Sequence, residues 1–76
     1  MGAQPTECSP GCSYQPVYYD GYGVNEAAAR LDAWTLCASE GPGQACYGMT
    51  FCNCYVAFCQ DQESTWYCYA HACCSA

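Results

Sequence analysis

Cysteine is the residue type in this sequence with the most chemistry to offer. Ten cysteines stand among 76 residues, and the close groups are Cys8-x3-Cys12, Cys52-x-Cys54 and Cys73-Cys74, with His71 beside the last pair. Reduced thiolates in such groups bind soft metal ions, whereas the same residues form disulfides in an oxidising compartment. The choice between these two chemistries decides most of what the sequence says about function.

A metal site fits the sequence less well than disulfides do. A zinc finger needs two CxxC or equivalent half-sites, and no CxxC occurs here. Metallothionein-like chains are organised by their metal cluster and use few aromatic side chains, whereas this chain has eight Tyr, two Trp and two Phe. We therefore expect no metal and no other cofactor. A thiolate protein that stores zinc or cadmium remains the alternative.

Disulfides agree with the number of cysteines. Ten in so short a chain exceed the roughly 8 to 10% that marks a disulfide scaffold, and an even count allows five bridges with no thiol left over. Scaffolds of this kind are typical of secreted proteins, so we expect an extracellular protein. The expected disulfide cysteines are Cys8, Cys12, Cys37, Cys46, Cys52, Cys54, Cys59, Cys68, Cys73 and Cys74. Their pairing is left open.

Two of the close pairs are expected to bridge to different neighbours. On a helix, Cys52 and Cys54 point about 200° apart, and the adjacent Cys73 and Cys74 point about 100° apart. Cys52 and Cys54 cannot then bind one ion without breaking the helix, and a bridge between Cys73 and Cys74 would close a strained eight-membered ring. Each cysteine should pair with a different element.

Nothing in the sequence favours catalysis. There is no CxxC redox pair, and the single histidine, His71, has no serine or free cysteine nucleophile assigned to it. The carboxylates are scattered over expected caps and loops. We therefore expect no enzyme.

The negative net charge of the chain makes some classes of binding partner unfavourable. Seven Asp and Glu oppose a single Arg30, which gives a net charge of -6. Nucleic acids and anionic membranes bind through Lys and Arg, so neither is expected as a partner. No apolar run approaches the roughly 18 residues of a membrane span, so no insertion is expected. No signal peptide is visible, so a secreted protein would be present here in its processed form.

The expected architecture is all-α. Asn25 is a good N-cap for a helix over residues 26–39 that ends at Gly41-Pro42-Gly43, and further helices are expected over 44–59 and 62–74, the last capped by Asp61. Residues 1–24, rich in Pro and Gly, read as an irregular arm. Short connections between three helices favour antiparallel neighbours. We expect a small disulfide-rich up-down-up three-helix bundle in a single domain.

Helical spacing assigns faces to these elements. In the first helix, the predicted core face is Ala27, Leu31, Trp34 and Ala38. In the second, a seam of Ala45, Met49, Cys52, Val56 and Cys59 runs beside a stripe of Gly48, Phe51, Tyr55 and Phe58. An apolar arc this broad, roughly 200°, needs two neighbours or a neighbour and a partner protein.

Part of the chain resembles a known family. "DAWTLC" from Asp32, "GPGQACY" from Gly41, and then Cys52, Cys54 and Cys59 are similar in order and spacing to the secreted pheromones, or mating-type factors, of the ciliate Euplotes, and most of all to the cold-water members. The resemblance covers about 30 residues, from Asp32 to Cys59. It implies a disulfide-rich bundle of three helices. This chain departs from the smaller members in having ten cysteines and a long N-terminal arm.

The resemblance also implies a function. Family members are water-borne signals that bind receptors on the cell that made them to promote growth, and on other mating types to induce pairing. The receptors are similar to membrane-anchored pheromones, so self-association and a possible homodimer are implied. The candidate contact residues for receptor binding or self-association are Tyr18, Tyr19, Tyr22, Phe51, Tyr55, Phe58, Trp66 and Tyr69. For each, packing in or over the core is the alternative.

Three hypotheses follow. The first is a secreted signalling protein that binds a cell-surface receptor and catalyses nothing. The second is the thiolate metal-storage protein, which predicts free thiols and bound metal. The third is a secreted defence or inhibitor protein, which would share the disulfides but act on a foreign target.

Overall fold

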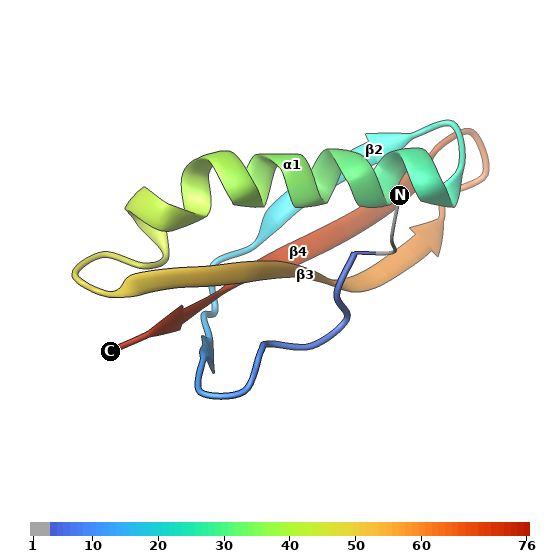
Figure 1. Cartoon of the computed structure of the whole chain (residues 1–76). Helices are drawn as coiled ribbons and strands as arrows, with labels where there is room; N and C mark the ends of the chain where they lie inside the picture. The colour runs from blue at the N-terminus through green and yellow to red at the C-terminus, as the bar shows by residue number, and fades with distance from the viewer. Residues whose placement is uncertain (1–3) are drawn as a thin grey trace.

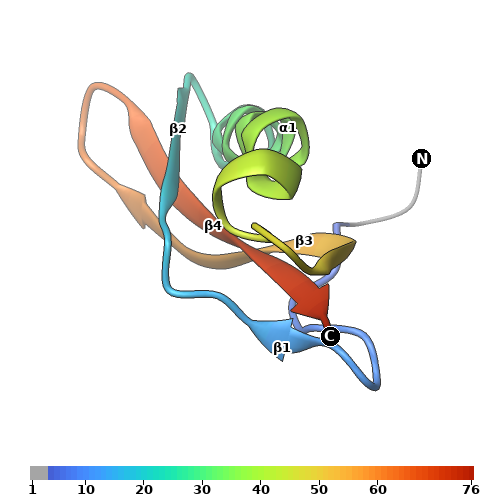
Figure 2. The same cartoon turned by 90° about the vertical axis from the view of Figure 1, so that its left-hand side faces the viewer.

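The computed structural model describes residues 4–76 and contains one helix and one antiparallel sheet (Figure 1). The elements are β1 (Ser13–Tyr14), β2 (Tyr19–Gly23), α1 (Glu26–Gln44), β3 (Thr50–Asp61) and β4 (Trp66–Ser75). β4 is the central strand: it pairs with β3 along one side, and with β1 and β2 along the other. Helix α1 crosses one face of the sheet, and the N-terminal arm runs past the opposite face (Figures 1 and 2). Because β2 and β3 are parallel with β4 between them, the topology is a split β-α-β unit.

The predicted three-helix bundle is wrong, because the segments expected as second and third helices are β3 and β4. In β3 the register shifts twice, between Phe51 and Asn53 and between Val56 and Phe58. Each bulge adds one residue to the alternation of a strand. The residues of β3 that pair with the helix-facing side of β4 are therefore Phe51, Cys54, Val56 and Cys59. Their spacing is 3, 2 and 3, so the two steps of three residues at the bulges resemble steps along one face of a helix.

The prediction of a helix over residues 62–74, where β4 lies, is wrong for a different reason. Its residues alternate between the two faces of the sheet, as the pleat requires, yet every residue from Ala70 to Cys74 is buried. With both faces covered, no alternation of polar and apolar residues marks the strand. The expected cap, Asp61, instead accepts a hydrogen bond from the Glu63 N–H (3.0 Å) in the turn between β3 and β4.

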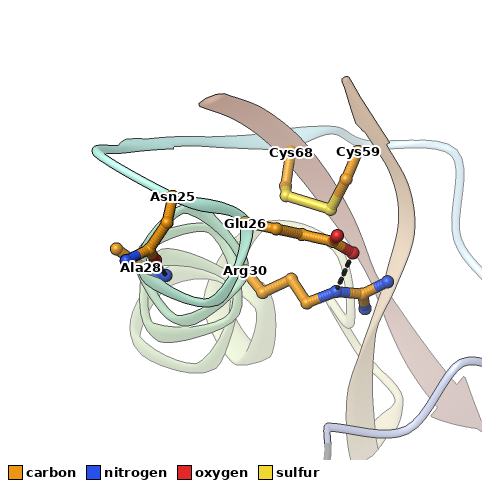
Figure 3. A network of polar contacts seen from close by, with 6 residues as sticks. All are labelled: Asn25, Glu26, Ala28, Arg30, Cys59 and Cys68. Atoms are coloured by element: carbon orange, nitrogen blue, oxygen red, sulfur yellow. Dashed lines mark hydrogen bonds and ion pairs between the residues drawn. A yellow bond between two sulfur atoms is a disulfide. The ribbon is translucent and has the colours of Figure 1, made fainter. Parts of the chain in front are cut away.

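The predicted start of the first helix is confirmed. Asn25 is the N-cap, and its side-chain oxygen accepts from the Ala28 N–H at 2.8 Å. Glu26 in the first turn pairs with Arg30 at 3.0 Å (Figure 3). The helix continues beyond residue 39 to Gln44, so Pro42 lies inside its last turn. The N–H groups of residues 45 and 46 both bond to the Gly41 carbonyl, which closes the helix just after the proline.

The buried face of α1 differs from the predicted one. The four residues that face the sheet are Ala29, Ala33, Cys37 and Gly41, all small and fully or almost fully buried. They lie against small residues of the sheet, such as Gly21, so the helix axis comes close to the strands. Leu31, expected in the core, is 46% exposed. Trp34 packs only at the edge of the core, and its buried indole N–H has no hydrogen-bond partner in residues 4–76.

All ten cysteines are paired. The bridges are Cys8–Cys73, Cys12–Cys52, Cys37–Cys54, Cys46–Cys74 and Cys59–Cys68. Adjacent residues of a strand point to opposite faces, so the last strand sends one vicinal cysteine to the arm and the other to the residue just after α1. The first bulge separates Cys52 and Cys54 in the same way. Each close pair therefore bridges to different neighbours, although strand geometry rather than helix geometry is the cause.

The expected irregular arm is only partly irregular. Within residues 4–24, two segments pair with β4 as β1 and β2, and the Pro5 carbonyl accepts from the Val56 N–H on the free edge of β3 at 3.3 Å. Residues 1–3 of this arm lie outside the described part of the chain. Together with two disulfides, these contacts fix the arm to the sheet.

The close approach of α1 to β2 gives the first prediction. A Cβ added at Gly21 would lie 2.6 Å from the Ala29 carbonyl oxygen and 2.7 Å from the Ala33 Cα. Both are backbone atoms, so Gly21→Ala should force the helix off the sheet and lower the free energy of unfolding by about 3 kcal/mol or more. Denaturant unfolding followed by circular dichroism measures this loss.

Gly43→Ala is the matched control for that variant. Gly43 lies in the last turn of α1, and a Cβ there meets no atom within 4 Å. Alanine favours a helix over glycine by up to ~1 kcal/mol, so this variant should be as stable as the parent or slightly more so. Equal unfolding midpoints for the two variants would contradict the packing described here.

Candidate protein-binding surface

The face of the sheet opposite α1 gathers aromatic side chains from every strand. The outward residues of β4 include Tyr67, Tyr69 and His71, and the strand register places Tyr22 beside the first and Phe58 beside the second. We call the whole set the tyrosine face. Its members are Tyr14, Tyr18, Tyr22, Tyr55, Phe58, Tyr67, Tyr69 and His71.

Strand geometry brings these rings together. Side chains two residues apart on a strand share a face, and residues directly opposite on neighbouring strands have their Cβ atoms within contact distance. Tyr55 lies opposite His71, and Phe58 lies opposite Tyr69. In a regular strand residues 55 and 58 would point to opposite faces, so the second bulge of β3 is what places both on the tyrosine face.

The rings form one continuous row of contacts. Tyr22 lies 5.3 Å from Tyr67 between ring centroids, Phe58 stacks on Tyr69 at 5.6 Å, and Tyr18 meets Tyr69 edge-on at 5.0 Å. The exposed fractions remain large: 53% for Tyr14, 63% for Tyr18, 55% for Tyr22 and 44% for Phe58. Exposed tyrosines with an apolar body and a polar end are typical of protein-binding surfaces.

His71 lies beneath this row as its buried centre. Only 2% of its surface is exposed, and the rings of Tyr14 and Tyr18 lie 4.5 and 4.9 Å from the imidazole. Its Nδ1 is 3.0 Å from the Val17 carbonyl oxygen, and its Nε2 is 3.4 Å from the Tyr14 hydroxyl. A neutral imidazole satisfies both contacts by donating from Nδ1 and accepting at Nε2. His71 therefore ties the segment between β1 and β2 to the sheet.

Burial lowers the pKa of His71 below the ordinary 6.5, and hydrogen bonds to backbone groups of Val17 and Gln15 oppose this effect only in part. Desolvation disfavours the charged imidazolium, which has no carboxylate within the ring contacts and hydrogen bonds described above. The neutral form is thus the one that the tyrosine face is built around.

Asp20 is the carboxylate on this face. It lies opposite Tyr69 in the strand register and accepts a hydrogen bond from the Tyr67 hydroxyl at 2.7 Å. Burial, together with the hydrogen bond to Asp20 and the negative charge of that carboxylate, raises the pKa of Tyr67 to about 12. The Tyr67 phenol therefore keeps its proton and donates to Asp20 throughout the physiological range.

The predicted contact residues divide between the two faces of the sheet. Tyr18, Tyr22, Tyr55, Phe58 and Tyr69 come together on the tyrosine face. Tyr19, Phe51 and Trp66 belong to the helix side: Tyr19 is 3% exposed, with its hydroxyl 3.5 Å from Gln44 Oε1, and the other two pack against the core.

Three members of the tyrosine face were missed. Tyr67 and His71 alternate with Tyr69 at spacing two, and this period was the available signal for an outward face of a strand. Tyr14 carries no such signal, because it joins the face only through the short pairing of β1 with Cys73 and Cys74.

No group of three His, Cys, Asp or Glu side chains within residues 4–76 is placed to hold a metal ion. In the same part of the chain, no helix has both the length and the hydropathy needed to cross a membrane. Comparison with protein-family models, with curated proteins and with solved structures gives no match to this chain.

The position of His71 predicts a pH dependence of stability. Its pKa is lower in the folded than in the unfolded chain, so the unfolded chain binds a proton first as the pH falls. The stabilisation is complete above about pH 6.5 and is lost as the pH falls through the folded pKa. Unfolding free energies measured between pH 7.5 and about 5.5, above the main titration of carboxylates, should therefore decrease.

Two measurements assign this slope to His71. The imidazole resonances in an NMR titration should show a midpoint below 6.5, and His71→Gln should flatten the stability profile over the same pH range, because it removes the titrating group. A midpoint at or above 6.5, or parallel profiles for parent and variant, would show that the buried histidine does not carry the effect.

Proposed function

We propose that this chain is an extracellular signalling protein that acts by binding a cell-surface receptor through its tyrosine face. The observation that supports this most directly is the exposure of Tyr14, Tyr18 and Tyr22, each above one half, within a continuous row of rings. The core does not need these side chains, since it lies on the other side of the sheet and is built mainly of small residues and disulfides around Tyr19. A continuous row of aromatic side chains that is open to solvent is expected to have a binding partner.

Five disulfides in a chain of 76 residues are compatible with an extracellular protein. The reducing conditions inside most cells keep such cysteines as thiols, and a core of this size rarely holds a fold without covalent links. Bridging all ten cysteines also removes the thiolates that the metal-storage hypothesis requires.

The receptor-binding role is suggested by the resemblance to Euplotes pheromones, whereas the surface proposed for it comes from the sheet of this chain. The family fold that the resemblance implied, a three-helix bundle, is not the fold of this chain. The similar segments span α1 and β3, which carry no member of the tyrosine face except Tyr55 and Phe58. Autocrine growth and the induction of mating pairs therefore remain proposals carried by the likeness in sequence, while the binding surface is argued from the sheet.

Intact mass spectrometry separates the disulfide protein from the metal-storage protein. The native chain should gain about 10 Da on reduction, one hydrogen for each of its ten cysteines, and metal analysis of the same sample should find no bound zinc or cadmium. An unchanged mass together with bound metal would overturn the proposal of an oxidised, extracellular protein.

Substitutions on the tyrosine face test receptor binding. The double variant Tyr18→Ser/Tyr22→Ser should bind the cells that produce the protein at least about tenfold more weakly, because exposed aromatic anchors carry much of the energy of an interface. Its unfolding midpoint should stay close to that of the parent, since both side chains are mostly exposed. Saturation binding of fluorescently labelled protein and thermal unfolding give the two values.

The matched control is Tyr47→Ser. Tyr47 is 88% exposed and lies in the turn between α1 and β3, outside the tyrosine face, so its loss should leave binding unchanged. Tyr19→Ala, in the core, should lower stability and binding together. Equal binding by the double variant and the Tyr47 variant would overturn the proposed surface, and saturable binding to foreign cells alone would favour the defence protein over the signalling protein.

A further inference from the structure

One carboxylate lies inside the tyrosine face and is surrounded by tyrosines. Asp20 occupies the outward position of β2 between Tyr18 and Tyr22, two residues away on either side, and across the strand pair it meets Tyr67 and Tyr69 of β4. The contacts between these rings, at 5.0 Å for Tyr18 with Tyr69 and 5.3 Å for Tyr22 with Tyr67, close the group around Asp20. The side chains form a group of four rings around one negative charge.

Asp20 keeps an unused acceptor. The Tyr67 hydroxyl donates to Oδ1 at 2.7 Å, whereas Oδ2 accepts no hydrogen bond from any side chain or backbone group of residues 4–76. The residue is exposed, so a group from outside can reach it. The hydrogen bond to Tyr67 fixes the carboxylate in place before any partner arrives, which reduces the ordering that binding would require.

The chain supplies no cation to this site. Its only Lys or Arg residue is Arg30, and this guanidinium is already paired with Glu26 on α1 at 3.0 Å. A net charge of -6 makes the approach of a basic partner favourable and that of a second copy unfavourable. The aromatic surface alone does not indicate the charge of its partner. Charge complementarity indicates that the partner is basic.

A guanidinium fits both parts of the site. Its planar group stacks on the face of a tyrosine ring, and its N–H donors form charge-assisted hydrogen bonds with a carboxylate. The ammonium of lysine can be attracted by the same groups, but it is a strongly hydrated point charge without a flat face. The arrangement of one acceptor among four rings thus favours arginine over lysine.

We propose that Asp20, with Tyr18, Tyr22, Tyr67 and Tyr69, binds an arginine side chain presented by the partner protein. This inference rests on the proposed function, in that it takes the tyrosine face as the surface that meets the partner. It adds the chemistry of the partner, a basic protein with an exposed arginine, and makes a second copy of this acidic chain the wrong occupant.

An NMR titration with short peptides tests the inference without the partner. The probe is N-acetyl-Gly-Arg-Gly-amide, and the comparison peptides carry citrulline, which is neutral and nearly isosteric, or lysine at the central position. The arginine peptide should shift the ring resonances of the four tyrosines in a saturable way, whereas the citrulline peptide should not, and the lysine peptide should bind more weakly. Added salt should weaken the binding of the arginine peptide, because it screens the attraction between the guanidinium and Asp20.

Asp20→Asn is the decisive variant. Asparagine keeps an oxygen that accepts from the Tyr67 hydroxyl but removes the charge, so the affinity for the arginine peptide should fall about three- to tenfold while the unfolding midpoint changes little. Glu40→Gln is the matched control, because it removes one exposed charge from α1, on the opposite side of the sheet, and should leave the affinity nearly unchanged.

Three outcomes would overturn the proposal: ring shifts of equal size with citrulline, an Asp20→Asn variant that binds as tightly as the parent, or the absence of any saturable shift. These failures are distinct from a failure of the proposed function. If labelled Asp20→Asn protein binds producing cells as well as the parent does, while Tyr18→Ser/Tyr22→Ser does not bind, then the tyrosine face is the receptor surface and the arginine inference alone is wrong. If the double tyrosine variant binds normally, the surface itself is wrong.

Discussion

The register of β4 is the constraint on which the rest of the molecule depends. One set of its residues, Cys68, Ala70, Ala72 and Cys74, faces α1, and the alternate set carries Tyr67, Tyr69 and His71 to the other side. A slip of one residue would exchange the two sets, placing rings under the helix and alanines on the tyrosine face. Disulfides prevent it, because the vicinal Cys73 and Cys74 are bonded to the arm and to the end of α1 on opposite faces.

The sequence predicts correctly those features that depend on residues close together in the chain. The N-cap and first turn of α1 depend on neighbouring residues, Asn25 and Glu26, and were predicted correctly. The strand identity of β3 is hidden by two bulges, which depend on pairing with β4 and which place successive residues of one face three positions apart instead of two. The close packing of α1 depends on Gly21, a distant residue, so helical hydrophobicity pointed to Leu31 and Trp34 while the small residues formed the contact. For the tyrosine face, Tyr18 and Tyr22 were among the predicted contact residues, but so was the buried Tyr19, and His71 and Tyr14 join the face only through the sheet.

The two faces of the sheet differ in residue size, with small side chains under α1 and most of the aromatic side chains on the opposite face. Because α1 approaches the strands so closely, the space between them is filled mainly by Ala, Gly, Cys and Val. Tyr19 is the one aromatic side chain of residues 4–76 that is buried there, whereas Phe51 and Trp66 are only partly buried against the core. Small side chains bury little apolar surface each, so the hydrophobic term is modest. The bridges supply the missing stability, since each typically contributes ~2 to 4 kcal/mol by restricting the unfolded chain. Covalent stabilisation thereby leaves most of the tyrosines free to remain at the surface.

An exposed aromatic face creates a risk of self-association, and the charge of the chain limits it. Two copies meeting through their tyrosine faces would bring two Asp20 carboxylates together in a partly desolvated interface, with no free arginine or lysine to neutralise them. Like charges placed together at an interface cost several kcal/mol. The same carboxylate that disfavours this pairing attracts a cationic partner, and the tyrosine hydroxyls keep the face wettable until that partner binds. Asp20 therefore adds to the net charge of -6 in opposing self-association and also favours a cationic partner at the centre of the surface.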